Sequence, residues 1–140
     1  MEKIPTYLFV VAAALVDQNG RILVQKRPEG KPMAGLWEFP GGKVEQGETP
    51  ETALVRELNE ELDIDVKEAD LESVAFASEA LGDRHLVLLL YISQKWSGNV
   101  RNAESQDVQW LEIDAIKQLP MPPADGPLVQ KLSNSLAALT

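Results

Sequence analysis

Cysteine is absent from this 140-residue chain, and histidine occurs once, as His85. Without cysteine the chain can form neither a disulfide nor a thiolate zinc site, and it has no cysteine nucleophile. A single histidine argues against a Ser-His-Asp hydrolase, and the sequence contains no Gly-x-Ser-x-Gly nucleophile elbow. These common forms of nucleophilic catalysis are therefore not expected.

Basic residues are also scarce, with 13 lysines and arginines against 22 aspartates and glutamates, which gives a formal net charge of −9. Proteins that hold a nucleic-acid backbone need a basic surface, because their affinity comes from Lys and Arg displacing counterions. We therefore expect no polymeric nucleic acid as a ligand.

Long apolar runs are missing as well. The run at residues 7–16 is too short to span a bilayer and does not have the layout of a signal peptide. We expect a soluble, cytoplasmic protein that does not bind a membrane. No repeat or linker divides the chain, and its length suffices for one core, so residues 1–140 are predicted to form a single domain.

Strand-like and helix-like runs alternate along the chain. Two apolar runs, residues 8–16 and 21–26, are separated by Asn19-Gly20, which is a strong signal for an antiparallel hairpin. A C-terminal helix is predicted from Pro123, and further strands are predicted within residues 71–77, 85–92 and 107–113. The pattern predicts an α+β fold in which a mixed β-sheet is flanked by helices.

The segment from Thr49 to Leu62 has the pattern of a helix. Thr49 is a suitable N-cap, Pro50 fits the first helical position, and leucines recur at positions 54, 58 and 62. The preceding residues 28–42 are rich in glycine and proline and are expected to form a long loop.

One face of this helix is acidic. At about 100° per residue, Glu57, Glu60 and Glu61 fall within roughly one third of the circumference, opposite the leucines. Like charges at these spacings destabilise a helix by a few tenths of a kcal/mol per pair, roughly, and a divalent cation would reverse that effect. Oxygen ligands without histidine or cysteine suit Mg²⁺, with Mn²⁺ as an alternative.

The acidic pattern by itself is also typical of a solvated surface helix. Its context favours a binding site, because Gly41-Gly42 leaves room for a phosphate or a metal to approach the main chain. The glycine spacing matches neither a P-loop nor a dinucleotide-binding fingerprint.

A longer spacing pattern surrounds the acidic face. Gly42, Glu48 and the run Arg56-Glu57-Leu58-Asn59-Glu60-Glu61-Leu62-Asp63-Ile64 resemble the Nudix box, the signature of hydrolases of nucleoside diphosphates linked to another group. The resemblance implies the Nudix fold, an α/β/α sandwich whose loop and helix carry the metal site. Asp63 departs from the pattern, which has glycine there. Glycine suits a left-handed helix end, and aspartate tolerates it at a cost of order 1 kcal/mol.

Residues outside the box are similar to the MutT branch of this family, whose members remove oxidised nucleotides. The matching segments cover most of the chain, at residues 36–45, 82–85, 95–98, 104–106 and 122–127. They are also similar to a sister group, the CTP pyrophosphohydrolases. The resemblance therefore implies hydrolysis of 8-oxo-dGTP to its monophosphate and pyrophosphate, with CTP or a modified dCTP as the alternative substrate.

The resemblance also implies a metal site with supporting residues. Its ligands would be the carbonyl of Gly41 and the carboxylates of Glu57, Glu60, Glu61 and Glu104. Arg56 would hold the helix carboxylates in place, and Glu48 would be a structural acid beside them. Either Glu57 or Glu104 would activate the water, and the sequence leaves that choice open.

Substrate-binding roles are implied for Arg27, Phe39, Arg84 and Asp125. The two arginines match basic residues near the nucleotide, and Phe39 adjoins the glycine pair. Asp125 matches the position that reads the base, where a well-known bacterial member has asparagine. An ionised carboxylate only accepts hydrogen bonds, so it suits the guanine edge and the N4 amine of cytosine alike.

A non-catalytic nucleotide-binding module on the same fold is the rival hypothesis, and the intact Glu57, Glu60 and Glu61 argue against it. The expected partner is a small nucleotide, and the chain is expected to be a monomer or a homodimer.

Overall fold

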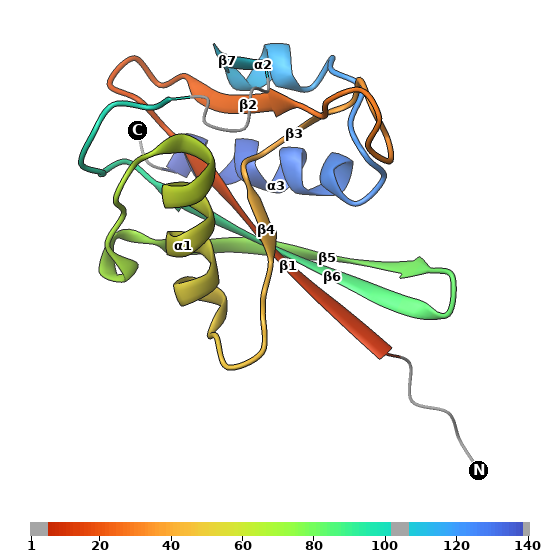
Figure 1. Cartoon of the computed structure of the whole chain (residues 1–140). Coiled ribbons are helices and arrows are strands. Elements are labelled where there is room, and N and C mark those ends of the chain that lie inside the picture. The colour runs from red at the N-terminus through yellow and green to blue at the C-terminus, as the bar shows by residue number, and fades with distance from the viewer. Residues whose placement is uncertain (1–5, 102–106, 139–140) are drawn as a thin grey trace.

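A mixed four-stranded sheet lies at the centre of the fold in the computed structural model, which describes residues 6–101 and 107–138 (Figure 1). Its order is β4-β1-β6-β5, with bounds of Gly41–Lys43, Thr6–Leu15, Arg84–Ser93 and Glu72–Leu81. β1 and β6 are parallel, and the other neighbouring pairs are antiparallel. A smaller antiparallel sheet has the order β3-β2-β7, with bounds of Trp37–Glu38, Ile22–Lys26 and Val108–Leu111.

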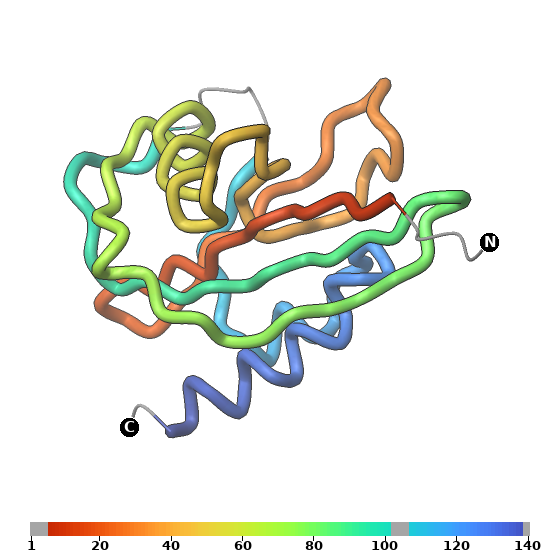
Figure 2. The backbone as a smooth tube through the Cα atoms, turned by 90° about the horizontal axis from the view of Figure 1, so that it is seen from below, coloured from red at the N-terminus to blue at the C-terminus, as the bar shows by residue number. Residues whose placement is uncertain are grey.

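The long helices α1 (Pro50–Leu62) and α3 (Asp125–Ala138) cover opposite faces of the four-stranded sheet (Figure 2). A short helix α2 (Ile113–Ile116) and a 3₁₀ turn η1 (Glu68–Asp70) complete the elements of the described residues. None of these helices is long and apolar enough to cross a membrane. The layers confirm the predicted α+β fold with a mixed sheet flanked by helices.

Burial on both faces explains the apolar run in the second half of β1, from Val11 to Leu15. Alternate side chains of a strand point to opposite faces of the sheet, so the two alternating sets of residues pack against different helices. Val11, Ala13 and Leu15 pack with the leucines of α1. Ala12 and Ala14 lie in the other cluster, with Leu128, Val129 and Leu132 of α3.

The predicted hairpin between residues 8–16 and 21–26 is wrong beyond its first residue pair. Both strands form, and Gly20 adopts the positive φ of 77° that the turn requires. However, β1 and β2 lie in different sheets, and their described pairing is the isolated bridge between Val16 and Ile22. β1 cannot pair with β2 further along, because β4 and β6 occupy its two edges.

The long loop expected over residues 28–42 contains two short strand segments in its second half. Trp37 and Glu38 form β3 by pairing with Lys26 and Gln25, and β4 starts at Gly41. These strands are too short to show an alternating pattern in the sequence. The strand predicted within residues 107–113 is confirmed but ends at Leu111, because α2 begins at Ile113.

Both ends of α1 agree with the prediction. The Thr49 hydroxyl accepts a hydrogen bond from the backbone N–H of Thr52 at 3.1 Å, and Pro50 opens the helix. Asp63 closes it in the left-handed conformation, with φ 57° and ψ 38°, and its N–H donates to the carbonyl of Asn59.

Replacing Asp63 with glycine is expected to raise the unfolding free energy by about 1 kcal/mol, because glycine adopts positive φ without the clash that a Cβ causes. The substitution also removes the ion pair between Asp63 and Arg101, whose charged atoms lie 3.5 Å apart. Both side chains are exposed, so this pair contributes little to the free energy of unfolding. Urea unfolding is the measurement. Asp114→Gly, at an exposed position inside α2, is the matched control and should lose about 1 kcal/mol instead. A loss of stability in both variants would contradict the prediction.

Candidate active site

The acidic face of α1 lies directly against the edge strand β4. A Cβ on Gly42 would come within 2.4 Å of the Glu57 carboxyl group, and one on Gly41 within 1.9 Å of the Val11 carbonyl oxygen. Ala53, on the same arc of the helix, is fully buried. The acidic face is therefore a packed contact in its middle. Gly42 is needed for α1 to approach β4 this closely, and Gly41 is needed for β4 to lie this close to β1.

The carbonyl of Gly41 points toward α1. Backbone hydrogen bonds at the residue pairs 9–44 and 13–40 join β4 to β1. Because bonded positions alternate along an antiparallel strand, the carbonyls of Gly41 and Lys43 point away from β1. The Lys43 carbonyl accepts a hydrogen bond from Nη2 of Arg56 at 3.2 Å, which identifies the side of α1. The Gly41 carbonyl therefore lies on the side where the resemblance expects a metal ligand.

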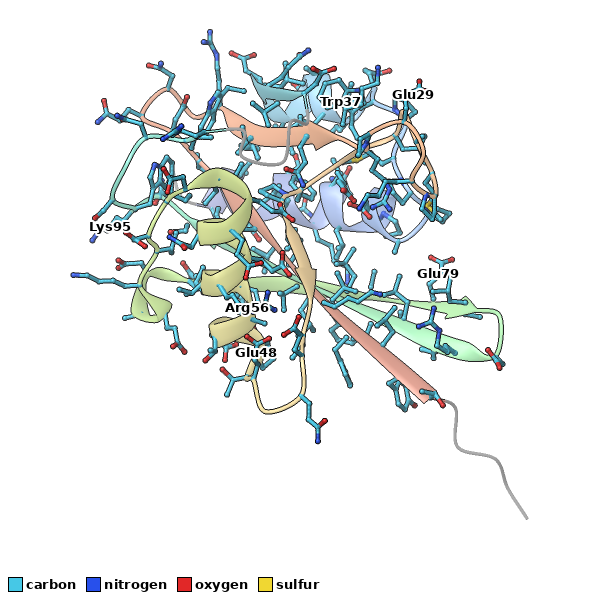
Figure 3. All side chains as sticks on the ribbon, viewed as in Figure 1. Glu29, Trp37, Glu48, Arg56, Glu79 and Lys95 are labelled. Atoms are coloured by element: carbon cyan, nitrogen blue, oxygen red, sulfur yellow. The ribbon has the colours of Figure 1, made fainter. Side chains whose placement is uncertain are left out.

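Arg56 forms a bidentate ion pair with Glu48 in the loop before α1 (Figure 3). Nε and Nη2 of Arg56 lie 2.7 and 2.9 Å from the two carboxylate oxygens. These bonds, with one from the backbone N–H of Glu45, lower the pKa of Glu48 to about 2. The pKa of Arg56 is raised in turn, mainly by Glu48. Glu48 is thus a fixed negative partner that orients the guanidinium.

The same guanidinium reaches the acidic face of α1. Nη1 of Arg56 lies 3.1 Å from Oε1 of Glu57 and 3.3 Å from Oε2 of Glu60. The Glu57 side chain is mostly buried, whereas that of Glu60 is exposed. One cation therefore connects the loop to two of the predicted metal ligands.

Glu61 lies deeper, beside the smaller sheet. Burial raises its pKa to about 8, and the nearby charges of Glu57 and Glu38 add to the increase, whereas a hydrogen bond from Gln25 opposes it. That bond joins Nε2 of Gln25 to Oε2 of Glu61 at 3.1 Å. Burial also raises the pKa of Glu57, and Arg56 opposes this increase. Without a cation these carboxyl groups therefore keep their protons to a higher pH, and a bound cation would stabilise their ionised forms.

The residues of this face fit a divalent metal by the chemistry of their donors. Carboxylate and carbonyl oxygens without nitrogen or sulfur ligands suit Mg²⁺. No three acidic or histidine side chains converge as a preformed metal cluster within residues 6–101 and 107–138, where Arg56 holds Glu57 and Glu60. Glu104, the other predicted ligand, lies outside the described residues.

A second group of charged residues lies around the start of α3. Nη1 of Arg27 pairs with Oε2 of Glu38 at 2.9 Å, and its Nε donates to the Pro32 carbonyl at 2.7 Å. Asp125 is only 6% exposed and accepts a hydrogen bond from the backbone N–H of Phe39. Burial raises the pKa of Asp125 to about 7, and the charge of Glu38 adds to the increase, while Arg27 lowers it.

Of the other two predicted substrate-binding residues, Phe39 joins this group only through its backbone, and among the described residues Arg84 does not join it. The Phe39 ring is buried in the core with Ala124 and Leu128, so its contact with Asp125 is made by the backbone. Arg84 begins β6, on the sheet face that Leu86 and Leu88 present to α3. The described contacts that join Arg27, Phe39 and Asp125 do not include Arg84.

The sequence interpretation missed Gln25 and Glu38, which connect the two groups. Gln25 lies opposite Glu38 in the β2-β3 pair and is almost fully buried. A polar residue directly after the buried Ile22-Leu23-Val24 was the available signal. Glu38 gave a similar one, since it stands between Trp37 and Phe39, both of which pack in the core.

The pKa of Asp125 predicts a stability that falls as pH rises. Between about pH 4 and 7 the unfolded chain ionises this carboxyl group while the folded chain keeps its proton, so folding is penalised increasingly up to pH 7. Asp125→Asn removes the penalty and keeps an oxygen for the Phe39 N–H. Relative to wild type, it should gain roughly 3 kcal/mol between pH 4.5 and pH 8 in urea unfolding. Asp114→Asn controls for the loss of one charge, and a gain no larger than that of the control would contradict the account.

Comparison with known proteins agrees with this site. Residues 6–132 match the NUDIX domain family. The 8-oxo-dGTP diphosphatase of Escherichia coli K12 is 34% identical over 126 residues, covering 89% of this chain and 95% of that protein. The CTP pyrophosphohydrolase of the same organism is 38% identical over 120 residues, covering 86% and 87%. The solution structure of the E. coli ORF135 protein superposes with a TM-score of 0.85 at 36% identity, covering 96% of this chain and 94% of that one.

The acidic helix and its arginine, the glycine edge and the match over nearly the whole chain lead to one conclusion. The chain belongs to the Nudix hydrolase family, and within it to the MutT-like enzymes that act on nucleoside triphosphates.

Proposed function

We propose that this chain, as a single domain, hydrolyses 8-oxo-dGTP to its monophosphate and pyrophosphate with Mg²⁺, Mn²⁺ being an alternative metal. The observation that carries the proposal is the connection between the two groups of residues. Glu61 on α1 is hydrogen-bonded to Gln25, which lies opposite Glu38, and Glu38 pairs with Arg27 beside Asp125. A nucleotide with its phosphates at α1 and its base at α3 would contact both.

The phosphate end uses the carboxylates of α1. Glu57, Glu60, Glu61 and the Gly41 carbonyl would hold Mg²⁺. When bound, the metal neutralises phosphate oxygens and lowers the pKa of water. A water oxygen would form a bond to phosphorus while the bond from that phosphorus to the oxygen between the α and β phosphates breaks. The bridging oxygen would keep the electron pair, so that monophosphate and pyrophosphate separate, and a carboxylate would take the proton of the water. Glu57 and Glu104 are the candidates for this base, and Arg56 positions Glu57 for either role.

The base end depends on Asp125. With a pKa of about 7, its carboxyl group is present in both protonation states near neutral pH. The ionised form accepts N–H groups of a guanine edge, and the protonated form can also donate to an oxidised purine. Asparagine, which also has a donor and an acceptor, stands at this position in a bacterial member. Arg27 and Arg84 would contribute positive charge near the nucleotide.

CTP or a modified dCTP is the second candidate substrate. The observation that favours it is the same carboxyl group, because ionised Asp125 can accept a hydrogen bond from the N4 amine of cytosine. The ionised form of Asp125 therefore suits both candidate substrates, and the oxidised purine can in addition use the protonated form.

Chromatographic product analysis with Mg²⁺ separates these candidates. The panel contains 8-oxo-dGTP, dGTP, CTP, 5-methyl-dCTP and ADP-ribose. We expect preference for 8-oxo-dGTP, with the monophosphate and pyrophosphate as products. Preference for the cytosine nucleotides would show that CTP or a modified dCTP, and not 8-oxo-dGTP, is the substrate. Measurable nucleotide binding without any turnover would show a binding module instead of an enzyme.

Replacing Glu60 with glutamine is expected to lower turnover by roughly 10²-fold or more, because the metal loses a charged ligand. The fold should be unaffected, since the Glu60 side chain is 54% exposed and its ion pair with Arg56 is dispensable for stability. Glu72→Gln, at an exposed position on β5, is the matched control and should keep normal turnover. The assignment of Glu60 would be wrong if the two variants had similar Mg²⁺-dependent rates.

A further inference from the structure

Gln25 is a buried polar side chain to which the reaction above assigns no role. It is 3% exposed and follows the fully buried Ile22, Leu23 and Val24 of β2. Burying an amide costs free energy unless its donors find partners. The position is therefore costly in a core that would accept an apolar residue, and the contacts of the amide must explain it.

The amide of Gln25 donates to carboxylates from two different parts of the fold. Its Nε2 lies 3.1 Å from Oε2 of Glu61 on α1. Gln25 is also paired with Glu38 across the β2-β3 ladder, so the two side chains share one face, and the amide donates a hydrogen bond to Glu38. Glu38 in turn pairs with Arg27 at 2.9 Å. One side chain thus connects the helix that carries the predicted metal ligands to strand β3, which lies beside Arg27 and Asp125 at the proposed base end of the site.

We propose that Gln25 is a positioning residue, whose amide fixes the carboxylate of Glu61 relative to the Glu38–Arg27 pair and so aligns the metal end of the site with the base end. This inference rests on the proposed function.

The chemistry of an amide suits this role. Glu38, Glu57 and Glu61 are near enough to repel one another, so without a donor between them Glu61 would turn away. A lysine or arginine at position 25 would also orient Glu61, but its charge would compete with a metal ion. A neutral amide orients the carboxylate and leaves its negative charge for the cation, as hydrogen-bonded partners of metal ligands commonly do.

The test compares Gln25→Met, which keeps the length of the side chain and removes both donors, with Gln109→Met as the matched control. Gln109 is an exposed glutamine on β7, paired with Val24 next to Gln25. Gln25→Asn keeps a polar amide but is one methylene shorter, so it serves as a second variant that folds if the methionine variant does not.

The readouts are the affinity of the nucleotide-free protein for Mn²⁺, followed by electron paramagnetic resonance, and kcat with 8-oxo-dGTP and Mg²⁺. Thermal melting identifies folded variants. We expect both Gln25 variants to bind Mn²⁺ about tenfold or more weakly than wild type and to lose a similar factor in kcat. Gln109→Met should match wild type in both.

A merely structural role would lower the melting temperature and leave the Mn²⁺ affinity of the folded variants unchanged. Retention of Mn²⁺ affinity within twofold in a folded Gln25 variant would overturn the inference. If wild type binds Mn²⁺ but hydrolyses no nucleotide, the proposed function fails, and the Mn²⁺ titrations still decide the role of Gln25. If wild type binds no Mn²⁺ at millimolar concentration, the inference is overturned as well.

Discussion

The contact of Arg56 with the acidic residues around it is the interaction on which the site depends. A single guanidinium bonds both oxygens of Glu48, one oxygen each of Glu57 and Glu60, and the carbonyl of Lys43. It thereby ties the loop before α1, the helix and the edge strand β4 to one point. In a chain with a net charge of −9, so many carboxylates would otherwise separate. The loop and the helix keep their relative position because Arg56 offsets the repulsion.

The second constraint is the close approach of α1 to the sheet. The site can form only where no side chain separates Glu57 from β4, and Gly42 provides that space. The apolar side of α1 supplies the opposing force by packing Leu54, Leu58 and Leu62 on the alternate residues of β1. Burial of this leucine face brings Glu57 against Gly42 and places Glu61 beside the smaller sheet, and burial raises the pKa values of both carboxyl groups.

Local sequence signals predicted the features that depend on local chemistry. The cap at Thr49, the proline start and the left-handed end at Asp63 are all properties of a few neighbouring residues, and all three are confirmed. The spacing of Gly42, Glu48 and the Arg56-to-Ile64 run identified the family for the same reason. The roles of the individual site residues stay predictions, and Glu104 lies outside the described residues.

Features that depend on long-range pairing were not predicted. Asn19-Gly20 specifies a turn, but it does not specify which strands β1 will pair with, and β4 and β6 take both of its edges. β3 has only two residues, which is too few to show alternation. The contacts of Gln25 and Glu38 can be recognised only when the relative positions of β2, β3 and α1 are known. Phe39 follows the same rule, since the sequence could not show that α3 would bury its ring.

The most direct test of the role of Arg56 is thermal melting of Arg56→Met without divalent metal, compared with Arg101→Met. Arg101 also faces a carboxylate, Asp63, but that pair is exposed on both sides and lies at the periphery. Because loss of Arg56 leaves Glu48, Glu57 and Glu60 without their common cation, Arg56→Met should melt about 5–10 °C below wild type, and Arg101→Met within about 2 °C of it. Equal melting temperatures in the two variants would contradict the claim that one guanidinium holds the acidic site together.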